Sequence, residues 1–410
     1  MNKKLLEKYA EEIVKVGLNL QEGQRLFISA GINTAPLVRE VTAKAYQNGC
    51  PYVFVYWNDE NLKKIRHEYA PRDSFEEFSK WLMEGVLKCA QRGDAYLSVT
   101  GTDPDLLAGY DPELIALELK TRAKYFRPAQ ELIVNGSVQW TVVCPPTPKW
   151  AAKIFPDNSI AEAEEKLWGV MEKLCRLNYD DPVSIWQKHL SDLGKRHTYL
   201  TEKGFETLHF YGAGTDLKVG MPKNHIWKGG GSKTLGGVDF SANLPTEEVF
   251  SAPHREKVDG VVRSTKPLNY YGNLIENFSL TFKNGCVVDF SAEKGEATLA
   301  KMIETDENAN MLGEVALVPH RSPISESGLI FYNTLYDENA ACHLAFGSAY
   351  RACVEGGIEM SAEELVEAGI NDSLIHVDFM IGSSDVDIDG IDADGSITPI
   401  MRNGEWAFTV

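Results

Sequence analysis

NLPTEEVFSAP, at residues 243–253, is the segment around which the rest of the chain is organised. Pro245 fixes its own φ and favours an extended conformation at the residue before it. Thr246 can brace a tight turn through its hydroxyl group. The adjacent carboxylates of Glu247 and Glu248 therefore lie on a stiffened loop. An acidic pair held in this way predicts a metal or catalytic site, and the alternative is a solvated turn with two surface glutamates.

The composition is that of a large, acidic, folded protein. Its 410 residues suffice for about two or three domains, and 43% of them are hydrophobic, so the chain can bury sizeable cores. The formal net charge of −18 at pH 7 repels nucleic acid and anionic membrane surfaces. No apolar run approaches the ~18 residues of a membrane span. We therefore expect neither nucleic acid nor a membrane as a partner.

The cysteines indicate a reducing compartment. Seven of them are spread along the chain without a CxxC pair, which argues against a disulfide framework or a zinc finger. The start of the chain has early lysines, but Glu7, Lys8 and Glu11 interrupt its apolar residues, so it lacks the apolar core of a signal peptide. We expect a cytoplasmic protein.

Short apolar runs alternate with amphipathic segments in the first half of the chain. The predicted strands are residues 25–30, 52–56, 95–100 and 138–144, and the predicted helices are residues 3–18, 35–48, 74–89 and 112–124. This alternation implies a largely parallel α/β sheet. The first half has no GxGxxG opening a helix and no GxxxxGK[ST], so the sequence does not support a nucleotide site.

The pattern changes near residue 195, after two predicted connecting helices at residues 160–177 and 184–193. Beyond this point short apolar runs are separated by turns such as Asn284-Gly285, which is a hairpin signal. We predict an N-terminal α/β domain of residues 1–195 with a largely parallel sheet. We predict that an α+β catalytic domain of residues 196–410, rich in antiparallel strands, follows it.

Two elements of the second half carry candidate ligands. Glu314 stands at the start of EVALVP, a predicted strand. Residues 337–350 (DENAACHLAFGSAY) are predicted as a helix, which would place His343 and Tyr350 about two turns apart on one face. A helical histidine is more often a structural residue than a ligand, so this helix alone decides nothing.

A third element, HVDFMI at residues 376–381, alternates like a strand and points His376 and Asp378 to the same face. An unpaired charge on an otherwise apolar strand is expensive, and a cation would remove that cost. The candidate ligands are all oxygen or nitrogen donors: Glu248, Glu314, His343, His376 and Asp378. Such a set, without thiolate, suits Zn²⁺, Co²⁺, Mn²⁺ or Mg²⁺.

NLPTEEVFSAP, EVALVP, the HLAFG segment and HVDFMIG occur in an order and spacing that resemble the thermophilic metallo-aminopeptidases, the M29 family. The first half looks like the family's N-terminal domain but has no comparably specific motif. The resemblance implies that the five candidate ligands bind two divalent metal ions and that Tyr350 faces the same site. It also implies a homodimer.

The resemblance implies a metallo-aminopeptidase acting on peptides with a free N-terminus. The metals would polarise the scissile carbonyl and activate a water molecule. Tyr350 would donate to the developing oxyanion, and Glu247, if not a ligand, is the candidate general base. The alternatives are another two-metal hydrolase, such as a phosphoesterase or an amidohydrolase, and a metal-stabilised binding protein. No group of Arg or Lys near the ligands supports a phosphate substrate.

Two motifs mimic other sites. DVDIDG at residues 385–390 resembles the first half of a calcium loop, but its twelfth position would be Ser396 and flanking helices are not expected. We predict a strand with Val386 and Ile388 pointing inward. The glycines at residues 229–231 resemble a phosphate loop but lack the following Lys-Ser/Thr, so we predict a flexible loop beside the site.

Overall fold

The computed structural model describes residues 3–212, 214–270 and 272–410, which divide into two compact units. The first unit is Met1–His189 with Gly231–Thr246, and the second is Leu190–Gly230 with Glu247–Val410. Unlike the expected division at residue 195, this one assigns residues 231–246 to the first unit. The segment NLPTEEVFSAP therefore begins in one unit and ends in the other.

The first unit is built on a parallel sheet, as predicted. Its five described strands have the order β10-β4-β3-β1-β2, and every described pairing is parallel. Their bounds are β1 Leu26–Gly31, β2 Val53–Asn58, β3 Ala95–Val99, β4 Trp140–Val143 and β10 Asn243–Leu244. The start of NLPTEEVFSAP thus forms an edge strand of this sheet. A small hairpin, β8 Ser232–Lys233 with β9 Asp239–Phe240, precedes it.

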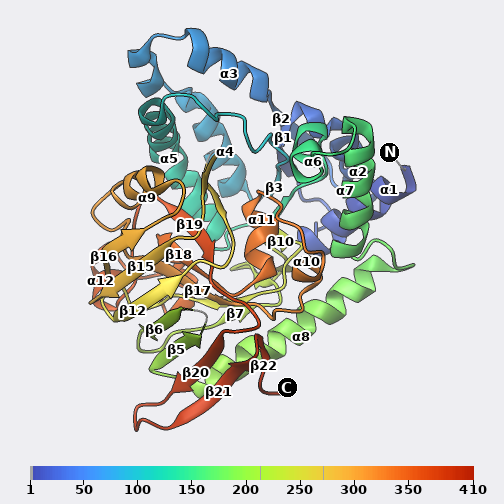
Figure 1. The fold of residues 1–410 in the computed structure, drawn as a ribbon. Coiled ribbons are helices and arrows are strands. Elements are labelled where there is room, and N and C mark those ends of the chain that lie inside the picture. Colours follow the sequence, from blue (N-terminus) through green and yellow to red (C-terminus); the bar gives the residue numbers. More distant parts are fainter. Residues whose placement is uncertain (1–2, 213, 271) are drawn as a thin grey trace. The chain divides into compact units, whose positions relative to one another are not determined.

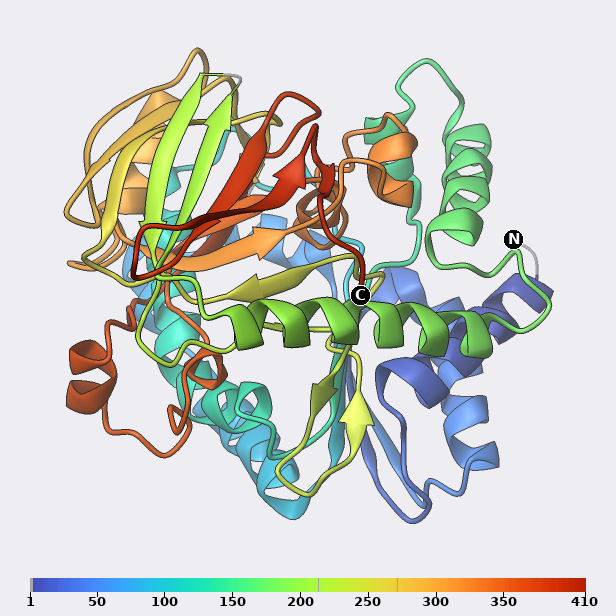
Figure 2. The ribbon, with the colours of Figure 1, turned by 90° about the horizontal axis from the view of Figure 1, so that it is seen from below.

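Helices follow the parallel strands, as the alternating pattern requires (Figure 1). Their bounds are α1 Lys3–Glu12, α2 Ala35–Gln47, α3 Glu60–Tyr69, α4 Lys80–Arg92, α5 Pro112–Val134, α6 Pro148–Ile154, α7 Ile160–Leu174 and α8 Pro182–Lys203. A core of Phe27 from β1, Val86 and Ala90 from α4, and Ala129 from α5 shows that α4 and α5 pack against the sheet. Helix α5 continues past its predicted end and contains Pro128. Helix α8 is the long green helix across the middle of Figure 2.

The second unit contains two antiparallel sheets, so the predicted α+β region rich in antiparallel strands is confirmed. Among the described residues one sheet has the order β19-β18-β17-β11-β7 and the other β16-β15-β12-β6-β5-β20-β21-β22. The strands of the first sheet are β7 Lys228–Gly229, β11 Val249–Ser251, β17 Leu312–Leu317, β18 His343–Gly347 and β19 His376–Met380. Those of the second are β5 Thr207–Gly212, β6 Thr215–Gly220, β12 Val258–Arg263, β15 Ser279–Lys283, β16 Cys286–Ser291, β20 Asp387–Ile391, β21 Ile397–Arg402 and β22 Glu405–Trp406.

Smaller elements complete this unit. They are the hairpin β13 Leu268–Tyr270 with β14 Asn273–Ile275, and the helices α9 Glu296–Ile303, α10 Pro323–Glu326, α11 Thr334–Asp337 and α12 Ala362–Glu367. The predicted hairpin turn joins β15 to β16, where Asn284 and Gly285 have φ of 50° and 84°. Positive φ at both central residues is what a tight two-residue hairpin turn requires.

A hydrophobic core joins the two antiparallel sheets. It contains Leu344 and Phe346 of β18 and Phe379 of β19, together with residues of the larger sheet such as Leu280. The ring centroids of Phe346 and Phe379 are 4.7 Å apart, within the range of favourable aromatic pairs. One face of the five-stranded sheet therefore packs in this core.

The helix predicted at residues 337–350 is wrong. This segment consists of the end of α11, a short 3₁₀ turn at Glu338–Ala340 and strand β18. Strand β18 pairs with β17 on one side and β19 on the other, and all five of its residues are buried. An apolar run that is covered on both faces has no polar side to reveal its period, so its sequence does not distinguish a strand from a helix.

The strand predicted in place of a calcium loop is confirmed. Val386 and Ile388 are buried, and β20 begins at Asp387. Asp387 accepts a hydrogen bond of 2.7 Å from the backbone N–H of Asn403, and Asp389 pairs with Arg402. These carboxylates are therefore engaged in joining the strands.

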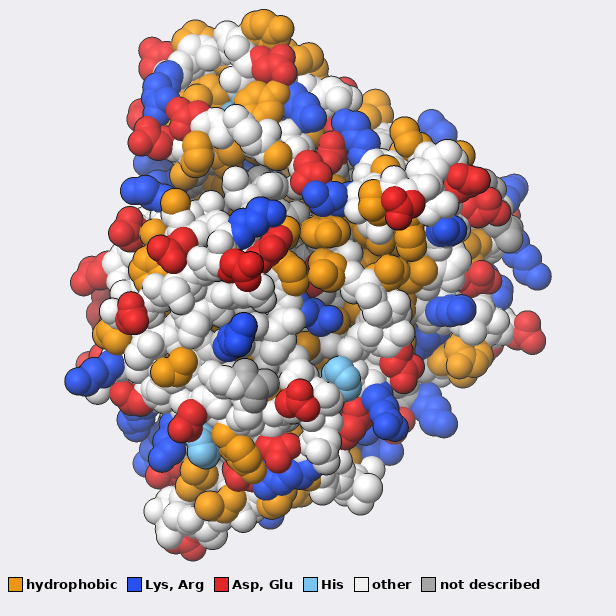
Figure 3. Space-filling view, viewed as in Figure 1, with side chains coloured by type: hydrophobic (Ala, Val, Ile, Leu, Met, Phe, Trp, Pro, Cys, Tyr) orange, Lys and Arg blue, Asp and Glu red, His pale blue; other side chains and the backbone are white. Residues whose placement is uncertain are grey.

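The surface carries charged side chains of both signs. Figure 3 shows Lys and Arg side chains scattered among Asp and Glu over the visible face. Among the described residues, none of the helices combines the length and the apolar composition that crossing a membrane requires.

We expect Phe379→Ala to destabilise the second unit by about 3–5 kcal/mol, because it leaves a cavity between the two sheets. The measurement is the urea midpoint followed by tryptophan fluorescence. Val288→Ala, at a side chain of β16 that is 59% exposed, is the matched control and should change stability by less than about 0.5 kcal/mol. Equal midpoints for the two variants would contradict the assignment of Phe379 to the core.

Candidate metal centre

The face of the five-stranded sheet opposite the core carries the predicted ligands. Val315 of β17 belongs to the core, so its neighbour Glu314 points to the other face. In β19, Phe379 belongs to the core and Asp378 points away from it. The same alternation in β18 directs His343 to the face of Glu314 and Asp378. Period-two alternation in three adjacent strands thus collects the polar groups.

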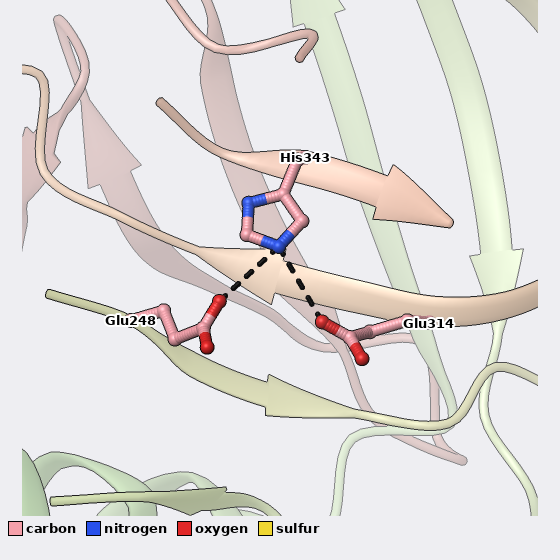
Figure 4. A group of neighbouring side chains, drawn as sticks. All are labelled: Glu248, Glu314 and His343. Atoms are coloured by element: carbon pink, nitrogen blue, oxygen red, sulfur yellow. Dashed lines mark ion pairs between the residues drawn. The ribbon is translucent and has the colours of Figure 1, made fainter. Parts of the chain in front are cut away.

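The five predicted ligands meet at short distances. The Nε2 atom of His343 lies 3.2 Å from Oε2 of Glu248 and 3.4 Å from Oε1 of Glu314 (Figure 4). The Nε2 atom of His376 lies 3.5 Å from Oε2 of Glu314 and 3.4 Å from Oδ1 of Asp378. The two oxygens of Glu314 therefore face different imidazoles. The cluster divides into two groups of possible ligands that share Glu314.

Backbone carbonyls orient both imidazoles. Nδ1 of His343 lies 3.2 Å from the carbonyl oxygen of Ala341, and Nδ1 of His376 lies 2.7 Å from that of Ser348. A carbonyl oxygen only accepts hydrogen bonds, so Nδ1 carries the proton and donates in each case. Each Nε2 is consequently directed at the carboxylates, which is the arrangement that second-layer partners impose on metal-binding histidines.

The cluster requires positive charge. Burial lowers the pKa of His376, but Asp378 and Glu314 outweigh it and raise the pKa to about 10. Burial also lowers the pKa of His343, but hydrogen bonds with Glu248 and Glu314 outweigh this effect and raise the pKa well above its usual value. Burial raises the pKa of Glu314, although His343 acts against this shift. Protons on the imidazoles supply the positive charge here, and a bound cation could replace them.

The residues present fit divalent metal ions. Oε2 of Glu248 is a buried carboxylate oxygen that lies 3.2 Å from Nε2 of His343 but, among the described residues, has no hydrogen bond of good geometry. Leaving such an atom unsatisfied is costly, and coordination to a cation would satisfy it. Three carboxylates with two imidazoles and no thiolate suit Zn²⁺, Co²⁺, Mn²⁺ or Mg²⁺.

The acidic loop is buried. Glu247 and Glu248 are 4% and 6% exposed, so the alternative of a solvated surface turn is wrong. Val249, the first residue of β11, is fully buried in the core and pairs with Gly229 of β7. A side chain at Gly229 would put its Cβ 2.7 Å from the carbonyl oxygen of Glu248, so only glycine fits there. This end of the glycine run is a strand rather than the predicted flexible loop.

Tyr350 lies beside the cluster, although it does not share a helix with His343. Its ring packs edge-on against His376, with centroids 5.3 Å apart, and also contacts Phe250 at 5.6 Å. Burial raises the pKa of the Tyr350 hydroxyl well above its usual value, and the charge of Glu314 adds to the effect. The phenol therefore keeps its proton at neutral pH and can donate a hydrogen bond.

Two further polar residues near the cluster were not identified from the sequence. Glu338 is 8% exposed and Asn339 is fully buried, and both lie in the 3₁₀ turn before β18. Burial raises the pKa of Glu338 well above its usual value, and the charges of Asp378 and Glu248 raise it further. The sequence signal was the polar group DEN before an apolar run. Acidic residues are common in the first turn of a helix, so the DEN group was interpreted as the start of the predicted helix rather than as part of a site.

Comparisons with known proteins cover nearly the whole chain. Residues 2–406 match the model of a family described as thermophilic metalloprotease (M29). The chain is 48% identical over 403 residues to aminopeptidase AmpS of Bacillus subtilis (strain 168), which is 98% of each chain. It is 47% identical over 405 residues to aminopeptidase 2 of Geobacillus stearothermophilus, covering 99% of this chain and 98% of the relative. The solved structure of wild-type AmpT from Thermus thermophilus has a TM-score of 0.93 and 42% identity, and covers 99% of this chain and 100% of its own.

We expect Gly313→Ala to weaken the binding of divalent metal by about 10–100-fold, the usual effect of disturbing a ligand's supporting contacts. Its Cβ would lie 2.5 Å from the carbonyl oxygen of Ser348, which orients His376. The measurement is Zn²⁺ affinity in competition with a chromogenic chelator. Gly85→Ala in α4, where a Cβ meets no atom within 4 Å, is the matched control and should leave the affinity unchanged. Equal affinities in both variants would contradict this role of Gly313.

Proposed function

This chain belongs to the thermophilic metalloprotease family (M29) and is a metal-dependent hydrolase of peptides, and from that premise we propose that it is an aminopeptidase with a two-metal centre. The observation that carries the proposal is the position of Glu314. Its Oε1 faces His343 and its Oε2 faces His376, so Glu314 belongs to both groups of possible ligands and would help to hold an ion in each. A single ion would need only one of the two groups.

Each ion has its own group of ligands under this proposal. Glu248, Glu314 and His343 would hold one ion, and Glu314, His376 and Asp378 would hold the other. Two divalent ions bound there would supply Lewis acidity toward the scissile carbonyl oxygen and lower the pKa of an attacking water molecule. Zn²⁺, Co²⁺, Mn²⁺ and Mg²⁺ are the candidates.

Residues of the chain perform the proton and hydrogen-bond steps. The Tyr350 hydroxyl, which keeps its proton, donates to the carbonyl oxygen as that oxygen gains negative charge. His376 holds the tyrosine ring edge-on and so limits where the hydroxyl can point. Glu247 accepts a proton from the attacking water and delivers it to the leaving amine. The hydrogen bond of 2.7 Å from its backbone N–H to Oδ1 of Asn339 holds the loop that carries Glu247.

The substrates in this proposal are peptides with a free N-terminus, since the relatives are aminopeptidases by name. A homodimer and a cytoplasmic location stay predictions from the sequence.

Variants of the two adjacent glutamates test their proposed roles. Wild-type protein should contain about two divalent ions per chain. Glu248→Gln should lose metal and activity together, because it removes a ligand charge. Glu247→Gln should keep both ions and lose kcat by roughly 10²–10⁴, the usual contribution of a positioned general base. Elemental analysis and steady-state kinetics on the same preparations decide the matter, and the opposite pattern would exchange the two roles.

Blocking the substrate amine tests exopeptidase action. We expect peptides with a free N-terminus to be shortened one residue at a time, and their N-acetylated counterparts to be essentially inert. A charge-assisted contact to the amine of about 3 kcal/mol corresponds to roughly a hundredfold in kcat/KM, and the added bulk increases the difference. Mass spectrometry of paired peptides over a time course is the measurement. Internal cleavage of the acetylated peptide at a comparable rate would show an endopeptidase instead.

A further inference from the structure

Lys228 is a basic residue on the face of the sheet that carries the proposed ligands. It lies directly opposite Phe250 where β7 pairs with β11, and Phe250 lies opposite Ala316 of β17. Ala316 in turn lies opposite His343 of β18. Residues opposite one another in antiparallel strands point to the same face, so Lys228, Phe250 and His343 share one face. Trp227, the residue before Lys228, is in the core, as the alternation along a strand requires.

This lysine has no counter-charge in the part of the chain that the structure describes. Its side chain is partly exposed, and its ammonium group forms no ion pair or hydrogen bond with a described residue. Among the described residues of the five strands it is the only Lys or Arg. A partly buried ammonium group without a partner keeps its capacity to bind an anion. An anionic group of a ligand on this face would therefore find its cationic partner at Lys228.

A row of partly exposed side chains leads from the metal centre to Lys228. The ring of His376, a proposed ligand, contacts that of Tyr350 at a centroid distance of 5.3 Å, and Tyr350 contacts Phe250 at 5.6 Å. Phe250 lies opposite Lys228. Solvent reaches all four side chains, which we call the track. Its two ring spacings correspond to about three residues of extended peptide at ~3.3 Å each.

The exposure of the ligands indicates the direction in which a bound peptide would leave the metal centre. One group of proposed ligands, Glu248, Glu314 and His343, is buried, whereas the side chain of His376 in the other group is 27% exposed. An exopeptidase holds the N-terminus of its substrate and must leave room for the remaining chain. That room is on the exposed side, where the track begins. The C-terminal part of the peptide would therefore follow the track toward Lys228.

We propose that Lys228 binds the C-terminal carboxylate of tripeptides and tetrapeptides whose N-terminus lies at the metal centre, and so directs the enzyme to short peptides. This assignment rests on the proposed aminopeptidase function. The carboxylates of the metal centre repel a second anionic group, and Lys228 lies at the other end of the track from them. Tyr350 and Phe250 contact the apolar parts of the residues between the two ends. The ammonium group donates charge-assisted hydrogen bonds to the substrate carboxylate.

Leucyl-glycyl-phenylalanine and its C-terminal amide differ in this one charge, so they test the assignment directly. Wild-type protein should release leucine from the free acid with a kcat/KM about 10–100-fold higher than from the amide, as expected for a charge-assisted contact. In Lys228→Met, which keeps a long apolar side chain, this ratio should fall to about one. Lys228→Arg keeps the charge and should retain most of the ratio. Mass spectrometry of the released leucine measures the rates, and elemental analysis verifies equal metal content.

Peptide length tests the span of the track. In peptides of about eight residues the C-terminal carboxylate lies beyond Lys228, so the ratio of acid to amide in wild-type protein should approach about one. An equally high ratio at this length would overturn the restriction to short peptides.

A second lysine provides the matched control. Lys283→Met, on an exposed side chain at the end of β15 in the larger sheet, should keep the wild-type ratio for the tripeptide. Circular dichroism and urea midpoints identify any variant that fails to fold. A general loss of activity would lower the rates for acid and amide alike, so the ratio distinguishes it from loss of the carboxylate contact.

The outcomes separate this assignment from the proposed function. Wild-type protein that hydrolyses neither the acid nor the amide would overturn both. Wild-type protein that hydrolyses the two equally well would overturn the assignment alone. A ratio in Lys228→Met equal to that of wild type would also overturn it, because the preference would then come from another group.

Discussion

Three buried carboxylates share one face of a sheet with two imidazoles, and the rest of the second unit holds them there. The carboxylates of Glu248, Glu314 and Asp378 are buried, and the protein interior screens charge poorly, so in their ionised form they would repel one another. Each imidazole Nε2 lies within 3.5 Å of two carboxylate oxygens, so positive charge between them stabilises the whole group. Protons can provide that charge, and divalent metal ions provide more of it in the same space.

The opposite face of the same sheet packs in the hydrophobic core, and this packing supports the charged face. Alternate residues of β17, β18 and β19 enter the core, where Phe346 and Phe379 pack together, and the residues between them form the site. Strands held on both sides fix side chains more precisely than loops do, which is what close-packed ligands require. The carbonyls of Ala341 and Ser348 then set the rotation of the two imidazoles. Packing, pairing and second-layer hydrogen bonds thus act on the same side chains.

The acidic loop has a different means of support. Glu248 precedes β11 and depends on what surrounds its backbone: Val249 is buried in the core, and Gly229 allows β7 to approach closely. Asn339 adds a side-chain acceptor for the N–H of Glu247 and a donor for Glu338. In the proposed mechanism these contacts link the loop of Glu247 and Glu248 to the buried turn before β18. A buried asparagine with its hydrogen bonds satisfied is suited to this, since it adds rigidity without charge.

The sequence by itself determined the classes of structure and the chemistry of the ligands. Alternation of strands and helices predicted the parallel sheet of the first unit, and period-two spacing placed His376 and Asp378 on one face of a strand. Donor types without thiolate indicated divalent metal. These features are local, because they follow from the spacing of residues along the chain. Three features are not local: the strand at His343, the membership of Glu314 in both ligand groups, and the burial of Glu338 and Asn339. They depend on which strands pair and which faces are covered, so only the tertiary structure decided them.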